Sequence, residues 1–480
     1  MKNTQTVVRQ LLTVLVTASV LATANDSLAA QEQTKPNIVF IFADDWGWGD
    51  LSCHGHPYVK TPNIDRLAKE GTDFHRFTTA SGVCSPSRTA VMTGHFPARY
   101  NIDGHFAWVP SNAKRNMPDW LDTGAPTIGG FLKTAGYKTA HFGKWHLSNN
   151  MIPDSPTPSA YGYDQYGAFN CSGEQMPVHQ DADNAVAFIE ESHSENKPFF
   201  INLWMHEPHT PFHTVPKYRW RFRELEEQDN IYASVLSHAD DRIGEVLDAI
   251  DRLGLTDNTL VIFSSDNGPA RSPGGKAKLD LMHDTATGAG YNIAAAKGIT
   301  GGRKGYKGAL FEGGIGVPFI VRWPGKVSAG AINNTAMISA VDLLPTFCEI
   351  AGVELPSSYA ADGISQVAAL TGEPDSEIKR AKPLFWKMNS AWPAGARKPD
   401  HWVSFAVVDQ NWKLVSNHDL SHSELYDLSQ DAFEKNNQAN SKPEIARKLL
   451  AKIADWKKTL PEKPSGNVFS SLRSEIKSAK

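Results

Sequence analysis

Four segments that are typical of short strands, at residues 37–42, 138–142, 199–205 and 260–263, constrain the fold most strongly. The first, Asn-Ile-Val-Phe-Ile-Phe, shows no alternation of apolar and polar residues, the pattern of a strand buried on both faces of a parallel sheet. Segments with helical spacing of apolar residues separate the strands, at residues 61–71, 126–136, 181–191 and 231–253. This alternation predicts an α/β fold, with a large, mainly parallel sheet sandwiched by helices.

Polar residues follow all four predicted strands. They are Asp44 and Asp45, Lys144 and His146, His206 and His209, and Asp266 and Asn267. Ligands of open α/β sheets bind beyond the carboxyl ends of the strands, so we expect these clusters to converge on one site.

Two of these clusters carry short side chains with oxygen atoms. Hard divalent cations such as Ca²⁺ and Mg²⁺ prefer such ligands, whereas zinc favours His or Cys. A single Asp-Asp or Asp-Asn pair is more often part of a turn or a helix cap. Because both pairs follow buried strands, Asp44, Asp45, Asp266 and Asn267 together indicate a metal site.

The remaining clusters are suited to binding an anion. Lys144 and His146 lie two residues apart and would project in the same direction from an extended segment. The prolines in His-Glu-Pro-His-Thr-Pro, residues 206–211, predict an extended backbone there. Lys307 has glycines nearby that let a ligand approach closely. With a metal and Arg88, these groups predict a pocket for a tetrahedral oxyanion.

Cys84 begins a stretch that also contains Pro86, Arg88 and an apolar run expected to form a helix. A cysteine of this kind is most often a buried structural thiol. The alternative is a nucleophile at a helix N-terminus, where free N–H groups and the helix dipole favour anions. The four cysteines are too few for a disulfide framework, and whether Cys53 and Cys171 pair stays open.

The second half of the chain predicts a smaller domain after the large one. Residues 271–305 resemble a long surface loop, and they precede a strand at 317–325 and a helix at 342–352. After a polar stretch near residue 375, short strands at 402–407 and 412–416 and a helix at 441–459 follow. We therefore expect a catalytic α/β domain at residues 30–375 and a C-terminal α+β subdomain at residues 376–480.

Residues 1–29 have the pattern of a signal peptide. Lys2 and Arg9 precede an apolar run at 11–24, and small residues that suit cleavage follow. That run has about 14 residues, fewer than the roughly 20 that span a bilayer. We expect an exported, soluble protein, periplasmic or secreted, without a membrane span. Lys and Arg number 48 against 52 Asp and Glu, without a basic run, so no nucleic-acid partner is expected.

The sequence Cys-Ser-Pro-Ser-Arg at residues 84–88 resembles the Cys-x-Pro-x-Arg signature of type I sulfatases, the formylglycine-dependent family of the alkaline-phosphatase-like superfamily. Further blocks of that family are similar and occur in the same order. They are Asp-Asp at 44–45, Thr-Gly at 93–94, Gly-Lys-Trp-His at 143–146, Asp-Asn-Gly at 266–268 and Glu-Gly-Gly at 312–314. Glu-Leu-Tyr-Asp-Leu at 424–428 is similar to the family's C-terminal domain, so the resemblance covers nearly the whole mature chain.

The resemblance implies that a maturation enzyme oxidises Cys84 to formylglycine. It also implies one calcium ion per chain, bound by Asp44, Asp45, Asp266, Asn267 and the modified Cys84. The hydrated aldehyde would attack the sulfur of a sulfate ester while the alcohol departs.

The resemblance assigns the other roles as well. Arg88 would hold the diol, Lys144 and Lys307 would bind sulfate oxygens, and His146 would accept a proton so that the aldehyde reforms. A further histidine protonates the leaving alcohol, and His206 and His209 compete for this role. We favour His209, because Pro-His-Thr-Pro-Phe at 208–212 resembles the commoner form of that block, and assign His206 to substrate binding.

The expected substrate is a sulfated carbohydrate, an algal polysaccharide such as carrageenan or a glycosaminoglycan, by analogy with exported members of the family. Arg303 is a candidate for substrate binding. Other aromatic and basic residues could line a sugar subsite: Trp108, Arg271, His283, Trp386, Trp392 and His401. One alternative is a phosphatase or phosphodiesterase of the same superfamily, which typically uses Ser or Thr and two zinc ions. Another is an inactive glycan-binding relative.

Overall fold

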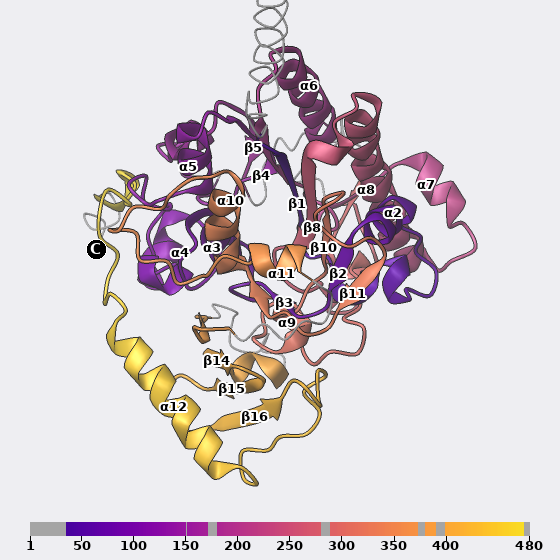
Figure 1. The fold of residues 1–480 in the computed structure, drawn as a ribbon. Helices are drawn as coiled ribbons and strands as arrows, with labels where there is room; N and C mark the ends of the chain where they lie inside the picture. Colours follow the sequence, from indigo (N-terminus) through magenta and orange to yellow (C-terminus); the bar gives the residue numbers. More distant parts are fainter. Residues whose placement is uncertain are drawn as a thin grey trace, which may run out of the picture. The chain divides into compact units, whose positions relative to one another are not determined.

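A mixed sheet of eight strands, drawn in Figure 1, forms the centre of the described structure. This computed structural model describes residues 35–149, 151–170, 180–279, 289–372, 380–389 and 399–474. The predicted signal peptide, Cys171, His283, Trp392 and the predicted boundary between residues 375 and 376 lie outside these ranges.

The strand order of the large sheet explains where the polar clusters lie. In order across the sheet the strands are β11 (Ala331–Asn333), β2 (Thr72–Phe74), β10 (Phe319–Arg322), β8 (Thr259–Ser265), β1 (Asn37–Ala43), β6 (Phe199–Trp204), β4 (Lys138–Lys144) and β5 (Gln165–Phe169). The strands from β8 to β5 are all parallel, whereas β10 runs antiparallel to both of its neighbours. The four strands predicted from the sequence are confirmed, and they lie next to one another.

Both faces of β1 are buried, which accounts for its uninterrupted apolar sequence. Phe40 and Phe42 pack into the hydrophobic core on one face of the sheet, and Val39 and Ile41 into the core on the other. None of these side chains is exposed. Because neither face meets water, the strand has no polar face, as expected of a central parallel strand.

Helices cover both faces of the sheet (Figure 1). On one face lie α3 (Cys84–Thr93), α5 (Ile128–Thr134) and α10 (Leu343–Ile350), and on the other α2 (Pro62–Glu70), α6 (Asp181–Ser194) and α8 (Glu227–Arg252). The predicted helices are confirmed, although α8 begins four residues earlier than its apolar pattern indicates. Shorter elements are β3 (Phe77–Thr78), α4 (Val109–Lys114), α7 (Pro216–Arg221), α9 (Glu312–Ile315), β12 (Ile338–Ser339) and α11 (Val367–Thr371).

Helix α3 is completely buried and begins at Cys84. Its threonine hydroxyl groups bond within the helix, since Thr89 Oγ1 donates to the Ser85 carbonyl at 2.9 Å and Thr93 Oγ1 to the Thr89 carbonyl at 2.7 Å. Its serine hydroxyl groups bond neighbouring segments: Ser87 Oγ donates to the Ser81 carbonyl and Ser85 Oγ accepts from the Phe106 amide, both at 2.9 Å. It ends at Gly94, whose φ of 65° is left-handed and favours glycine. The polar sequence of this helix therefore suits a buried position.

A second, antiparallel sheet forms the C-terminal part, in the lower half of Figure 1. It contains β13 (Leu384–Lys387), β14 (Phe405–Asp409), β15 (Trp412–Ser416) and β16 (Ser423–Asp427), and α12 (Pro443–Lys458) packs on it through Leu449 and Ile453. Trp386, one of the residues that could line a sugar subsite, is 1% exposed. Its Nε1 donates to the Thr79 carbonyl at 2.7 Å, so it belongs to the core.

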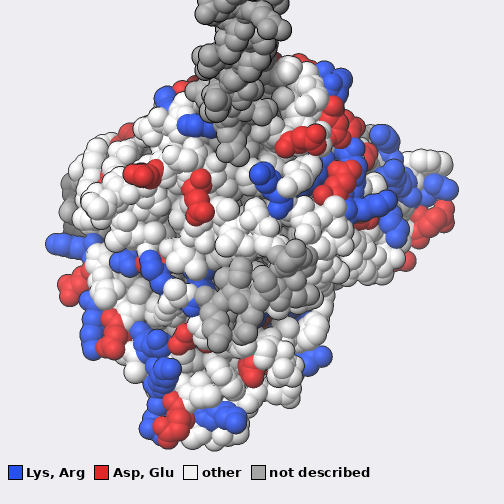
Figure 2. All heavy atoms as spheres, in the orientation of Figure 1, with Lys and Arg blue, Asp and Glu red and all other residues white. Residues whose placement is uncertain are grey.

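The prediction of a loop throughout residues 271–305 is wrong in part. β9 (Ala289–Tyr291) pairs antiparallel with β7 (Phe212–Thr214), a partner that lies far away in the sequence. No described helix is both long and apolar enough to cross a membrane. Figure 2 shows Lys and Arg interspersed with Asp and Glu on the face that it presents.

Candidate active site

The ends of β1 and β8 bring three carboxylates together. Ala43 pairs with Ser265, so the residues that follow are also neighbours. The Asp45 amide donates to Asp266 Oδ1 at 3.2 Å, and Asn267 Nδ2 donates to Asp45 Oδ1 at 2.7 Å. Oxygens of Asp44, Asp45 and Asp266 all lie within 4.8 Å of one another.

Burial raises the pKa of all three carboxyl groups, that of Asp266 to about 7. Repulsion from neighbouring carboxylates adds to this, and basic groups oppose it. Lys144 Nζ donates to Asp44 Oδ2, and Lys307 Nζ lies 2.7 Å from Asp45 Oδ1. The cluster is therefore a buried concentration of negative charge that gains stability from cations.

The oxygen atoms fit a calcium ion. Asp44 Oδ1 and Asn267 Oδ1 are buried, and neither accepts a hydrogen bond from the described protein. Buried oxygens without donors are costly, and a hard cation that prefers oxygen ligands would satisfy both. The residues present thus match the metal that the resemblance implies.

Arg88 joins the carboxylates to the end of β4. Its Nε and Nη2 donate to Asp266 Oδ2 at 3.0 and 2.7 Å, and its Nη1 donates to the Lys144 carbonyl at 2.8 Å. The guanidinium lies 5.1 Å from the centre of the Trp204 ring and is not exposed. Because Arg88 lies one turn after Cys84 in α3, it fixes the start of the helix against the carboxylate cluster.

Cys84 lies in reach of His146. The thiol is 2% exposed, and the His146 side chain makes a hydrogen bond with it. His146 Nε2 lies 3.1 Å from the Phe106 carbonyl, which only accepts, so Nε2 carries the proton and Nδ1 can accept one. The expectation of an extended segment from Lys144 to His146 is wrong, because His146 has a left-handed φ of 49°.

His105 also belongs to this site, and sequence reasoning missed it. Its ring centre is 6.5 Å from that of His146. Burial lowers the pKa of His105 to about 4, and the Cys84 thiol opposes that shift. The only local signal is a histidine after a glycine in a loop, which does not distinguish a functional residue from an ordinary one.

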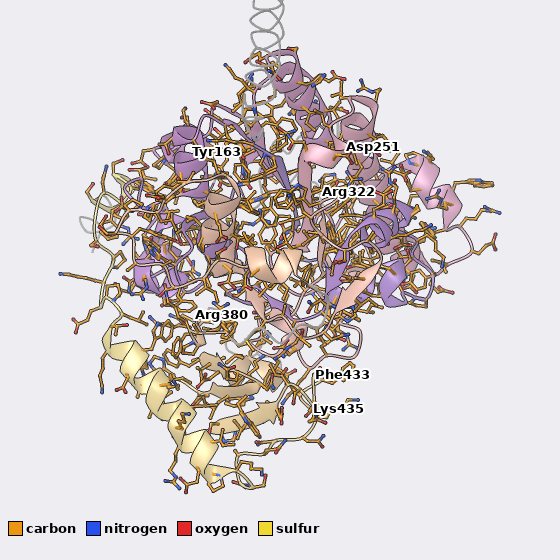
Figure 3. The ribbon with its side chains drawn as sticks, in the orientation of Figure 1. Tyr163, Asp251, Arg322, Arg380, Phe433 and Lys435 are labelled. Atoms are coloured by element: carbon orange, nitrogen blue, oxygen red, sulfur yellow. The ribbon has the colours of Figure 1, made fainter. Side chains whose placement is uncertain are left out.

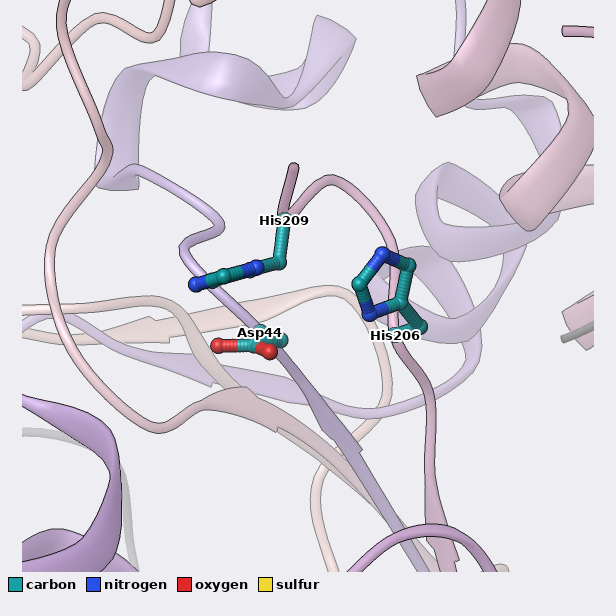
Figure 4. Close-up of side chains that lie close together, drawn as sticks. All are labelled: Asp44, His206 and His209. Atoms are coloured by element: carbon teal, nitrogen blue, oxygen red, sulfur yellow. The ribbon is translucent and has the colours of Figure 1, made fainter. Parts of the chain in front are cut away.

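The two histidines after β6 take different positions (Figure 4). The segment is turned and not extended as predicted, since the His209 amide donates to the His206 carbonyl at 2.8 Å. His206 is 1% exposed, with Nε2 3.2 Å from the Pro211 carbonyl. His209 Nδ1 lies 2.6 Å from the Thr210 carbonyl, which leaves Nε2, 3.8 Å from Asp45 Oδ2, directed at the cluster.

Lys307 approaches the cluster from the loop before α9. Its backbone amide donates to the Pro269 carbonyl at 3.1 Å, which holds the loop beside the end of β8. Burial alone would lower the pKa of Lys307, but Asp45, Cys84 and Asp44 together outweigh burial and raise it. The ammonium group is therefore charged at neutral pH.

The other described candidate residues make contacts of a different kind. Arg303 stacks 3.9 Å from the Trp48 ring centre, and its Nη2 donates to the His75 carbonyl at 3.3 Å. Trp108 is 54% exposed, Arg271 donates to the Tyr306 hydroxyl at 3.2 Å, and His401 is buried.

Comparison with known proteins identifies the family. The sequence matches the Sulfatase family over residues 36–353 and the C-terminal region of N-sulphoglucosamine sulphohydrolase over residues 304–459. The chain belongs to the sulfatase family. It has the α/β fold of the alkaline-phosphatase-like superfamily, as predicted, and is a sulfuric ester hydrolase.

Several relatives of this sulfatase act on sulfated sugars, according to their names. It is 28% identical to an N-acetylgalactosamine-6-O-sulfatase of Bacteroides thetaiotaomicron, over 87% of this chain and 92% of the relative. It is 30% identical to human N-acetylgalactosamine-6-sulfatase, over 70% of this chain and 66% of the human protein. The crystal structure of Ps i-CgsB with k-i-k-neocarrahexaose has the same fold, with a TM-score of 0.72 at 24% identity, over 92% of this chain and 96% of that chain.

Proposed function

We propose that this sulfatase hydrolyses a 6-O-sulfate ester on a hexosamine or galactose unit of a sulfated glycan. The observation that carries the proposal is the convergence of Cys84, two lysines and two histidines on a buried carboxylate cluster. The names of the relatives support an N-acetylgalactosamine 6-sulfate unit.

Two groups would complete the site. Asp44, Asp45, Asp266 and Asn267 would hold calcium, which supplies charge neutralisation and polarises sulfate oxygens. Formylglycine formed from Cys84 by a maturation enzyme would supply the nucleophilic hydroxyl group.

The remaining residues bind the ester and move protons. Lys144 contacts Asp44 and Lys307 contacts Asp45, so both ammonium groups lie beside the carboxylates and would hold sulfate oxygens there. His146, whose side chain contacts Cys84, would accept a proton from the group at residue 84. His209 would donate a proton from Nε2 to the oxygen of the departing sugar.

The protonation of His209 depends on the substrate. Without a ligand, the pKa of His209 lies well below its ordinary value. Burial of the ring is the main cause, and the positive charges of Lys307 and Lys144 add to it. A sulfate ester between the lysines adds negative charge beside the ring, and that charge favours the protonated acid.

We also propose that the protein is exported. The basic start, apolar run and small residues of residues 1–29 support this. Detection of a mature N-terminus near residue 30 in the periplasm or culture medium of the native host would support export, and a cytoplasmic protein with Met1 retained would contradict it.

A phosphatase or phosphodiesterase is not favoured, because the chain belongs to the sulfatase family and has cysteine where those enzymes typically use Ser or Thr. A comparison of 4-nitrophenyl sulfate with 4-nitrophenyl phosphate separates the two reactions. Sulfate release should exceed phosphate release, and the Cys84→Ala variant should lose it. Peptide mass analysis of protein from the native host tests whether Cys84 carries the aldehyde. Finding the aldehyde would exclude the alternative that this chain is an inactive glycan-binding relative.

A further inference from the structure

A second polar cavity lies outside the carboxylate cluster. It has a volume of about 580 Å³ and is lined by residues from segments that flank the strands of the large sheet and from the C-terminal part, among them Trp48, His75, Arg76, Arg303, Asn411 and Phe433. Figure 3 labels Phe433 and Arg380, which both line it, beside the C-terminal sheet. The described lining residues include three arginines and no Asp or Glu.

Two of these arginines keep unsatisfied donors. Arg380 is neutralised by Asp342, with Nη1 2.6 Å from Oδ2. Among the described residues, the side chain of Arg76 donates to the Thr335 carbonyl and Asn411 Oδ1, and that of Arg303 to the His75 carbonyl. Arg76 Nη2 and Arg303 Nη1 are buried and donate to no described protein atom.

Unlike Arg380, Arg76 and Arg303 form no ion pair with the residues that the structure describes. Burial lowers the pKa of Arg303 to about 10 and lowers that of Arg76, because nearby carboxylates compensate only in part. Both groups are still charged at neutral pH. Buried cationic donors without partners are costly, and a bound anion would remove that cost.

The cavity opens on the same edge of the sheet as the active site. Because β10 is antiparallel to both β8 and β2, strand β2 runs parallel to β1 and ends on the edge that carries Asp44. Three strand spacings separate β2 from β1, which amounts to roughly 14 Å.

Two chain segments also connect the cavity with the active site. Trp48 follows Asp45 by three residues, and Arg303 precedes Lys307 by four. A glycan that places one sulfate at Lys307 therefore has a neighbouring anionic group within reach of the cavity.

A cation is a poorer occupant of this region. His54, Asp73 and His75 lie close enough to bind one. However, His54 Nδ1 faces the Trp48 carbonyl at 2.6 Å, and His54 Nε2 faces Asp73 Oδ2 at 2.6 Å. Both ring nitrogens of His54 are therefore engaged by oxygen atoms of the protein, and neither is free to bind a metal.

We infer that this cavity, which we call the arginine cavity, is an accessory subsite that binds a second anionic group of an oligosaccharide whose neighbouring unit is desulfated. The guanidinium groups of Arg76 and Arg303 bind the anion, and the amide of Asn411 and the aromatic ring of Phe433 contact the sugar. The inference rests on the proposed function and specifies its substrate as an oligosaccharide with more than one anionic group.

The test compares long and short substrates. The probes are a chondroitin 6-sulfate hexasaccharide and 4-nitrophenyl sulfate, which is too small to reach both sites. We expect Arg76→Gln to lower kcat/KM for the hexasaccharide about tenfold more than for 4-nitrophenyl sulfate, since it removes a charged donor. The exposed surface variant Arg447→Gln, in α12, should leave both values unchanged.

A second pair of variants keeps the test informative if Arg76→Gln does not fold. Ala432 lines the cavity and is exposed, so substitution there removes no hydrogen bond of a side chain. Ala432→Asp should weaken hexasaccharide turnover selectively through its charge, whereas the similarly sized Ala432→Asn should not.

The two failures are distinguishable. The accessory subsite is refuted if Arg76→Gln and Ala432→Asp both keep the wild-type ratio of kcat/KM for the hexasaccharide to kcat/KM for 4-nitrophenyl sulfate. The sulfatase function would still stand. If the wild type releases sulfate from no ester, the proposed function fails. Calorimetry then decides on the cavity alone: hexasaccharide binding that weakens about tenfold in Arg76→Gln supports it, and an unchanged Kd overturns it.

Discussion

The role of His209 as the acid for the leaving group gives the sharpest kinetic prediction. His209 Nδ1 is held by the Thr210 carbonyl, so Nε2 is the only ring atom that can deliver a proton to the site. His206 Nε2 faces the Pro211 carbonyl and its side chain is buried. His209→Ala should therefore lower kcat much more than His206→Ala.

The size of the effect follows from the chemistry of the leaving group. General acid catalysis contributes about 10² to 10⁴ in rate, or about 3 to 5 kcal/mol of the barrier. A sugar alkoxide is a poor leaving group and needs the proton, whereas nitrophenolate departs almost unaided. His209→Ala should thus lower kcat by at least about 100-fold on N-acetylgalactosamine 6-sulfate, and by less than about tenfold on 4-nitrophenyl sulfate.

The assay measures kcat for both substrates with both histidine variants, after mass analysis shows equal conversion of Cys84 in each protein. His206→Ala serves as the matched control, because it also removes a buried imidazole next to the same carboxylates. Equal losses on the two substrates, or a larger loss in His206→Ala, would refute the assignment.

Three further predictions concern stability. Lys413 Nζ is buried between Glu312 Oε1 at 2.8 Å and Glu434 Oε1 at 2.9 Å. Lys413→Met leaves the two carboxylates without their cation, so it should lower the free energy of unfolding, measured in urea, by about 3 to 5 kcal/mol. A decrease of less than about 1 kcal/mol would contradict this. Burial lowers the pKa of His141 to about 3, so the folded protein keeps this residue neutral. Because the unfolded chain binds a proton there below about pH 6.5, the contribution of His141 to the free energy of unfolding should fall by about 1.4 kcal/mol per pH unit between about pH 6.5 and 3. His141→Gln should remove that component, and an unchanged slope would disprove it. Calcium at about 1,000 times its Kd should add about 4 kcal/mol to the free energy of unfolding. EGTA should reverse this increase, and the Asp266→Asn variant should not show it. The same melting temperature with and without calcium would argue against the site.

Much of the fold is predictable from the sequence because its strands are short, apolar and central. The segment at β1 reads as a strand buried on two faces, and its side chains do enter two cores. Since parallel strands end on one edge, the convergence of Asp44 and Asp266 also follows from the pattern. The structure brings these residues together as expected.

The parts that resisted prediction depend on contacts between distant segments. Strand β9 pairs with β7, and the strand propensity of residues 271–305 does not reveal that partner. The position of His105 beside His146 arises from the loop after α3 packing under the end of β4. Trp386 is one of the aromatic residues that could line a sugar subsite, yet its Nε1 donates to the distant Thr79 carbonyl and the side chain lies in the core.

The central claim is that Cys84, once converted to formylglycine, hydrolyses a sulfate ester at this calcium-binding cluster. Its most direct test is sulfate release from a panel of defined sulfated glycans by protein whose Cys84 conversion has been measured by mass analysis. The account predicts release that rises in proportion to the converted fraction, is greatest on N-acetylgalactosamine 6-sulfate units, and disappears in Cys84→Ala. Release from none of the sulfate esters by fully converted, calcium-loaded protein, or equal release by Cys84→Ala, would contradict it.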